Sequence, residues 1–149
     1  MVPKVALDTN ILLDVLLEDR PHKAEAEIIL SAAVAGKLSA QITTQSIIDA
    51  AYTSRKNGID YNTFVESIDR LRSCLAISAV DWIDMSWFIT SQDFVSSGDF
   101  EDDAQLANAY NSLCDYFITR DKKLLSLNKY DSPLLIVSPE EFVSAMEAK

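Results

Sequence analysis

The sequence is short of cysteine and histidine, which excludes several kinds of site. Its 149 residues include two cysteines and one histidine. Cys74 and Cys114 lie in apolar surroundings without metal-ligand spacing, so we expect reduced, buried thiols. A cysteine-based zinc site and a disulfide framework are therefore excluded. His22 is explained by a solvated position at a helix start, and we do not assign it to catalysis.

Positive charge is also scarce: 13 Lys and Arg stand against 23 Asp and Glu, a formal net charge of -10. Nonspecific binding of nucleic acid rests on basic residues that neutralise phosphates, so this balance argues against it. The argument weakens if several acids gather at one metal site, because bound cations reverse the local field. An acidic protein can also await a basic partner.

Long apolar runs are absent. No run approaches the roughly 18 residues that a membrane span needs, and the start lacks a signal-peptide pattern. We therefore expect a cytoplasmic protein without a membrane partner. With 48% hydrophobic and 24% charged residues, the composition is that of an ordinary globular protein, and the length predicts a single domain over residues 1–149.

Short apolar runs alternate with helical patterns along the whole chain. Strands are predicted at 4–7, 38–43, 74–79, 116–119 and 134–137. Helices are predicted at 11–16, 24–34, 44–56, 60–72, 81–90, 100–114, 122–127 and 139–146, with a loop at 91–98. This alternation predicts an α/β fold, a three-layer α/β/α sandwich with a central parallel sheet of four to five strands.

Four aspartates are predicted to meet at one edge of this sheet. Asp8 ends the first strand and Asp121 follows the fourth, so both lie at the carboxyl edge, where ligands collect in such sheets. Asp102 starts the helix that leads into the fourth strand, which places it at the same edge. Asp49 lies about one turn into the helix after the second strand and can face that edge too.

Clustered carboxylates repel one another and stay ionised only beside positive charge, which a divalent cation supplies. All-oxygen ligation suits Mg²⁺ or Mn²⁺, which activates water for attack on a phosphodiester. Singly, however, each acid has a structural explanation as a helix cap or a solvated group. We interpret Asp99 as an N-cap and Asp103 as a cap or solvated acid, although Asp103 could share the role of Asp102.

Five blocks in order resemble PIN-domain proteins: VALDTNILLD at 5–14, QSIIDAAY at 45–52, DFEDDAQ at 99–105, FITRD at 117–121 and VSPEEF at 137–142. The resemblance implies Mg²⁺- or Mn²⁺-dependent endoribonuclease activity on RNA, often as the toxin of a toxin-antitoxin pair. It assigns Asp8, Asp102 and Asp121 to the metal, and Asn10 and Thr119 to orienting roles. Many PIN domains have Glu where this chain has Asp49, which is one methylene shorter.

Further expectations concern partners and alternatives. An antitoxin protein is implied by the resemblance, and a homodimer by aromatic residues beyond what one core needs, such as Trp87, Phe88 and Phe94. Arg55, Lys56 and Arg120 are candidate phosphate contacts.

The competing hypothesis is a catalytically silent module that binds RNA or protein. A phosphate-accepting receiver domain also fits the α/β alternation, but this chain lacks the suitably placed Lys and the acid pair after the first strand that such a domain needs.

Overall fold

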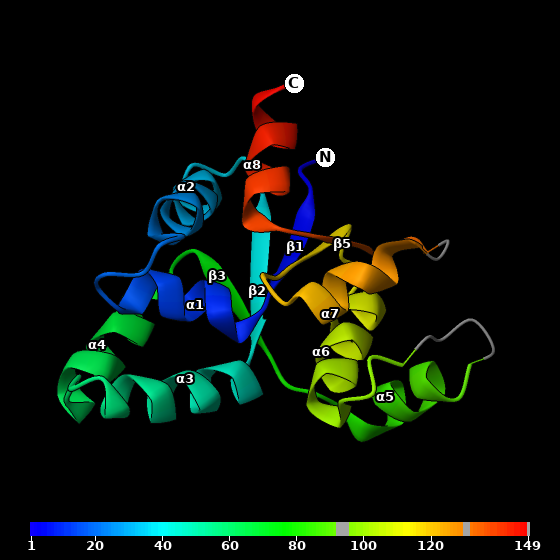
Figure 1. Cartoon of the computed structure of the whole chain (residues 1–149), viewed down its shortest axis with the longest axis horizontal. Coiled ribbons are helices and arrows are strands. Elements are labelled where there is room, and N and C mark those ends of the chain that lie inside the picture. Colours follow the sequence, from blue (N-terminus) through cyan, green and yellow to red (C-terminus); the bar gives the residue numbers. More distant parts are fainter. Residues whose placement is uncertain (92–95, 130–131, 149) are drawn as a thin grey trace.

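The computed structural model describes residues 1–91, 96–129 and 132–148 (Figure 1). Its strands are β1 (Lys4–Leu7), β2 (Ser39–Thr43), β3 (Leu75–Ser78), β4 (Tyr116–Ile118) and β5 (Leu135–Val137). Its helices are α1 (Thr9–Leu16), α2 (Lys23–Val34), α3 (Thr44–Lys56), α4 (Tyr61–Leu71), α5 (Trp82–Ile89), α6 (Phe100–Asn111), α7 (Lys122–Leu125), the 3-10 helix η1 (Ser126–Lys129) and α8 (Pro139–Glu147). Each predicted strand and helix is present, with ends shifted by a few residues.

All five strands run parallel in one sheet, in the order β3-β2-β1-β4-β5. The chain fills the sheet from β1 to β3 on one side and then returns to the other side of β1 for β4 and β5. Such a reversal leaves a crevice at the carboxyl ends of the two strands beside it. Leu7 pairs with Ile118 across this point, so Asp8 and Thr119 follow the two strands next to each other.

Helices cover both faces of the sheet (Figure 1). Alternate residues of β1 point to opposite faces, so Val5 and Leu7 join one core cluster and Ala6 joins another. The first cluster brings in residues of α1, α2, α3 and α8, and the second those of α6 and α7. The predicted three-layer sandwich around a parallel sheet is thus confirmed.

Several details of the sequence interpretation change. The helical spacing of residues 81–90 predicts that Trp82 and Met85 both face inward. Met85 is buried in the short helix α5, which packs against α6, but Trp82 is 64% exposed. Cys114 is buried, which raises the pKa of its thiol to about 11, whereas Cys74 is only half-buried; both are free. The predicted loop at 91–98 and Phe94 lie partly or wholly outside the described residues. In the described part of the chain, no helix is long and apolar enough to cross a membrane.

Candidate active site

Asp8 is fixed at the end of β1 through both of its carboxylate oxygens. Oδ2 accepts a hydrogen bond from Thr119 Oγ1 at 2.6 Å, and Oδ1 accepts one from the Thr9 N–H at 2.7 Å. The residue is 6% exposed. Burial raises the pKa of Asp8, and the negative charge of Asp121 adds to the rise, although the two hydrogen bonds oppose it. This carboxylate is oriented and buried, and the nearby charge of Arg120 offsets the rise only in part.

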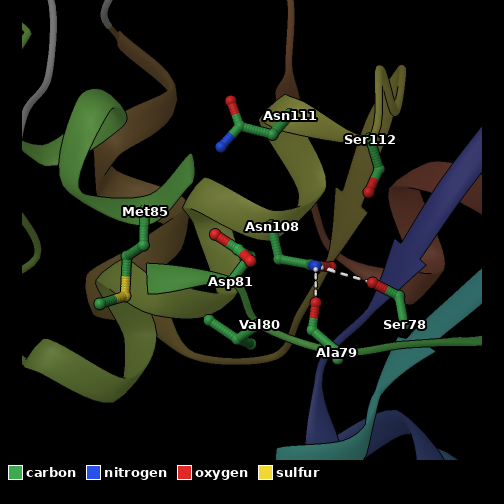
Figure 2. A pocket seen from close by; sticks show the side chains of 8 residues that line it. All are labelled: Ser78, Ala79, Val80, Asp81, Met85, Asn108, Asn111 and Ser112. Carbon is green, nitrogen blue, oxygen red and sulfur yellow. Dashed lines mark hydrogen bonds between the residues drawn. The ribbon is translucent and has the colours of Figure 1, made fainter. Parts of the chain in front are cut away.

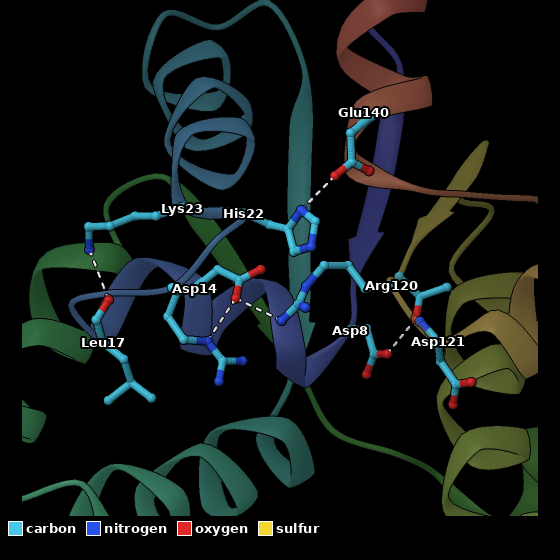
Figure 3. A network of polar contacts seen from close by, with 10 residues as sticks. Asp8, Asp14, Leu17, His22, Lys23, Arg120, Asp121 and Glu140 are labelled. Carbon is cyan, nitrogen blue, oxygen red and sulfur yellow. Dashed lines mark hydrogen bonds and ion pairs between the residues drawn. The ribbon is translucent and has the colours of Figure 1, made fainter.

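Thr119 connects Asp8 to Asp121. Its fully buried hydroxyl donates to Asp8 and also accepts from the Asp121 N–H at 3.0 Å. Asp121 in turn caps α7, where its Oδ1 accepts from the Lys123 N–H at 2.8 Å. One hydroxyl thus sets the relative position of two predicted site acids. Figure 3 shows Asp8 and Asp121 on neighbouring strand ends.

Asp102 reaches the same place from α6. Its N–H donates to Oδ1 of the N-cap residue Asp99 at 3.1 Å, so Asp99 is the cap that the sequence predicted. Burial raises the pKa of Asp102 to about 6, helped by the charges of Asp99, Asp8 and Asp121. Asp8 and Asp121 are therefore near enough for their charges to act on Asp102.

Lys123 is the cation that opposes the raised pKa of Asp102, and the sequence analysis did not single it out. Its Nζ lies 3.5 Å from the place that a Cβ would take at Gly98, which has a φ of +82°. The available signal was Asp121 as a helix cap, since a cap there places Lys122 and Lys123 in the first turn beside the acids.

Asp103 behaves differently from its neighbour, and the prediction of a cap or solvated acid is wrong. It is 5% exposed and accepts hydrogen bonds from Ser96 Oγ at 2.7 Å, the Ser97 N–H at 2.8 Å and Ser97 Oγ at 2.7 Å. These bonds hold the segment that enters α6. The carboxylate of Asp103 is therefore engaged with this segment, while that of Asp102 interacts with the acids.

Asp49 pairs with another acid that the sequence analysis missed, Glu101. Its Oδ1 accepts from Gln45 Nε2 at 3.0 Å, and its Oδ2 is buried without a donor among the described residues. Contact with the Asp49 carboxyl group raises the pKa of Glu101 to about 7, and burial adds to the rise. The structure thus couples Asp49 to Glu101, and the main charges acting on Asp8 and Asp102 come from other acids.

The two polar residues after Asp8 differ in their surroundings. Thr9 donates from Oγ1 to Ser46 Oγ at 2.9 Å, and the buried Ser46 hydroxyl also bonds to Gln105 Oε1 at 3.2 Å. This cluster ties the starts of α1 and α3 to α6. Asn10 lies in the first turn of α1, partly exposed, and its side chain has no hydrogen-bond partner within the described residues. Its amide is free to meet a ligand.

Arg120, a candidate phosphate contact in the sequence analysis, is bound to a buried acid. Its Nη2 lies 2.8 Å from Asp14 Oδ1, and Arg20 Nε lies 3.0 Å from the same oxygen (Figure 3). Asp14 is fully buried in α1. This ion-paired group escaped the sequence analysis because Arg20 and Arg120 are far apart in the chain.

A family model described as a PIN domain matches residues 4–123. The chain belongs to the PIN-domain family. The matched stretch contains all four aspartates that the sequence analysis selected, and it confirms the resemblance seen there. None of the curated proteins matches the chain in sequence.

Solved structures share the fold of this PIN domain. VapBC2 from Rickettsia felis, bound to a promoter DNA fragment, has a TM-score of 0.63 at 14% identity, covering 91% of this chain and 98% of that one. A toxin-antitoxin complex from Klebsiella pneumoniae has 0.61 at 21%, covering 89% and 99%. VapC20 from Mycobacterium tuberculosis, a toxin that cleaves the sarcin-ricin loop, has 0.59 at 10%, covering 79% and 90%. At these identities the likeness shows the fold.

The donor set of this PIN domain fits a hard divalent cation. Asp8, Asp102 and Asp121 offer only oxygen, and no described Lys or Arg forms an ion pair with them. Among the described residues, these three acids are not a group whose ligand atoms all lie within 4.8 Å. A cation would bind one or two carboxylates directly and reach the rest through water, as Mg²⁺ commonly does.

A separate hollow lies beside the C-terminal end of α6, away from the start of that helix. It measures about 220 Å³ and is lined by residues of the β3–α5 connection, α5 and the end of α6 (Figure 2). Asn108 forms part of its wall and donates to Ser78 Oγ at 2.7 Å and to the Ala79 carbonyl at 3.2 Å. None of the predicted site residues lines it, so the acidic site of this PIN domain is distinct from this hollow.

Proposed function

We propose that this protein is a metal-dependent endoribonuclease that hydrolyses RNA phosphodiester bonds, as the toxin of a toxin-antitoxin pair. One observation carries the proposal: the negative charge of Asp121 helps to raise the pKa of Asp8, the charges of Asp8 and Asp121 help to raise that of Asp102, and no described basic side chain forms an ion pair with these acids. Membership of the PIN-domain family supports it, as do similar structures that are toxins or toxin-antitoxin complexes.

Each proposed residue has a definable task. Asp8, Asp102 and Asp121 would hold Mg²⁺ or Mn²⁺. When bound, the cation supplies the charge that activates water and stabilises the developing negative charge on the phosphate. Thr119 keeps Asp8 and Asp121 in register, and Asn10 offers an amide to the substrate. Asp49 acts with Glu101, whose pKa is raised to about 7 chiefly by its contact with Asp49, so that Glu101 can hold and release a proton near neutral pH.

An antitoxin is the proposed protein partner. The net charge of -10 favours a basic partner, and an arginine of that partner could enter the acidic site in place of the cation. A homodimer is proposed as well, because Trp87 is 75% exposed and Leu113 is 83% exposed. Light scattering that finds only monomers at high concentration would contradict the dimer.

The test is cleavage of a mixed set of labelled RNAs with Mg²⁺, with Mn²⁺ and with EDTA, using protein from a nuclease-deficient host. Asp8→Asn and Asp102→Asn are each expected to lower metal-dependent cleavage by about 100-fold or more. Asp69→Asn is the matched control, because this acid lies on α4, 66% exposed, and pairs with Arg72. Cleavage that survives unchanged in Asp8→Asn would reveal a contaminating nuclease and remove the proposal.

A catalytically silent RNA- or protein-binding module is the alternative. It is favoured by the coupling of the short Asp49 side chain to Glu101 rather than to the other acids. Calorimetry with Mn²⁺ separates the two functions. Absence of binding at millimolar Mn²⁺, together with absence of cleavage, would select the silent module.

A further inference from the structure

A second group of potential metal ligands lies between the first turns of α2 and α8. His22 is the N-cap residue of α2, Glu25 lies in the first turn of that helix, and Glu140 lies in the first turn of α8. Within residues 1–91, 96–129 and 132–148, this is the group of three side chains whose possible ligand atoms all lie within 4.8 Å of one another. It contains none of the acids proposed for catalysis.

His22 and Glu140 form the contact between the two helices. Nδ1 of His22 lies 2.7 Å from Oε1 of Glu140, and Figure 3 shows the imidazole turned toward that carboxylate. The side chains are 39% and 45% exposed. His22 thus lies at a helix start and is partly exposed, as the sequence predicts, but its ring is also held against a second helix.

Glu25 supplies an independent observation. Its Oε2 is buried and has no hydrogen-bond donor among the described residues. The N-terminus of α2 accounts for a negative charge at this position, but it does not satisfy that oxygen. A buried carboxylate oxygen without a partner is costly, and a cation bound between the three side chains would remove the cost.

We propose that His22, Glu25 and Glu140 bind a divalent transition-metal ion of the Zn²⁺ type. One imidazole and two carboxylates are ligands that Zn²⁺ accepts, with water completing the coordination. Bond lengths of 2.0–2.1 Å in a tetrahedral site place neighbouring ligand atoms roughly 3.3 Å apart. The separations here, from 2.7 Å for the His22–Glu140 pair up to the 4.8 Å limit, bracket that value, so small side-chain rotations suffice.

Such a site would fasten α8 to α2. Glu140 is held in place because Ser138 and Glu141 form a capping box and Pro139 opens the helix. His22 and Glu25 come from the other helix, so a shared ion would act as a cross-link between the two first turns. The ion would therefore stabilise the docking of α8 against α2 without requiring any nuclease activity.

The test uses the fact that His22 is the one histidine of the chain. Zn²⁺ is titrated into protein carrying Asp8→Asn and Asp102→Asn, which removes the acidic site, and the imidazole signals are followed by NMR. We expect the signals to move with one equivalent of Zn²⁺, and the thermal unfolding midpoint to rise by a few degrees. Calorimetry in the same background should show at least a tenfold weaker affinity for Glu25→Gln and for Glu140→Gln.

Glu27→Gln is the matched control, since Glu27 lies on the same helix, is 58% exposed and pairs with Lys23. It should bind Zn²⁺ as the background protein does. Circular dichroism checks that each variant is folded. The proposal is overturned if the imidazole signals do not move, if Zn²⁺ binds equally well after His22→Gln, or if the Glu25→Gln and Glu140→Gln variants bind as tightly as the control.

Discussion

Two buried carboxylates near the same edge of the sheet, those of Asp14 and Asp8, differ in whether cationic side chains pair with them. Asp14 is fully buried and is bound by Arg20 and Arg120. Asp8 is almost as buried, yet its partners are one hydroxyl and one amide, and its pKa is raised. A buried acid that serves only the fold is neutralised by cationic side chains. An acid without such an ion-pair partner can instead bind a cation from solution.

The largest expected effect comes from removing the neutralised acid. Asp14→Ala would leave Arg120, with a side chain only 21% exposed, without its counter-charge. We expect the free energy of unfolding to fall by about 3–5 kcal/mol, the usual effect of breaking a buried ion pair. Urea unfolding measures this, and the exposed Glu18→Ala should change stability by less than about 0.5 kcal/mol. A loss below about 1 kcal/mol would show that the ion pairs of Asp14 do not stabilise the fold, and the contrast with Asp8 would no longer hold.

Asp103 represents a third kind of buried acid, whose carboxylate accepts hydrogen bonds from hydroxyl and amide donors and has no ion-pair partner among the described residues. Asp103→Ala removes the acceptor for Ser96 and Ser97, so we expect a loss of about 1–3 kcal/mol in unfolding free energy. The segment that enters α6 should then exchange its amide hydrogens faster. Unchanged exchange at Ser97 would show that Asp103 does not hold this segment.

Asp102→Asn tests an acid that has no ion-pair partner. The substitution removes a charge that repels Asp8 and Asp121, so without metal we expect stability within about 0.5 kcal/mol of the parent or slightly above it. Mn²⁺ should raise the thermal midpoint of the parent but not that of the variant. A clear loss of stability in EDTA would mean that Asp102 is a structural acid like Asp14.

The smallest expected effect is a pH dependence. The pKa of Asp102 rises from 3.8 to about 6 on folding, so the folded metal-free protein keeps a proton that the unfolded chain releases. Its contribution to stability is therefore present below the lower value, declines as the pH rises between 3.8 and about 6, and is lost above that. Urea unfolding in EDTA across this range should show a shallower decline for Asp102→Asn than for the parent. Parallel curves would contradict this.

Much of the candidate site could be found from local sequence because topology places it. An acid directly after a buried parallel strand must emerge at the carboxyl edge, and this reasoning located Asp8 and Asp121. The N-cap role of Asp99 followed from helix-start chemistry alone. Neither argument needs knowledge of contacts between distant residues.

The sequence predictions failed where the role of a residue depends on the direction in which its side chain points. Asp102 and Asp103 are neighbours in one helical turn, about 100° apart around its axis, so one interacts with the acids and the other holds the preceding segment. The exposure of Trp82 and the contact of His22 with Glu140 were missed for the same kind of reason, since the residues of one helix do not reveal what that helix packs against.

The sequence by itself determined the alternation of strands and helices, the parallel sheet and the acids at the strand ends, because these follow from local periodicity and chain direction. Only the tertiary structure decided the strand order that places β4 beside β1, the pairing of Asp49 with Glu101, and the burial of Asp14 between two arginines. These features depend on residues far apart in the chain, whose approach is fixed by packing rather than by any local pattern.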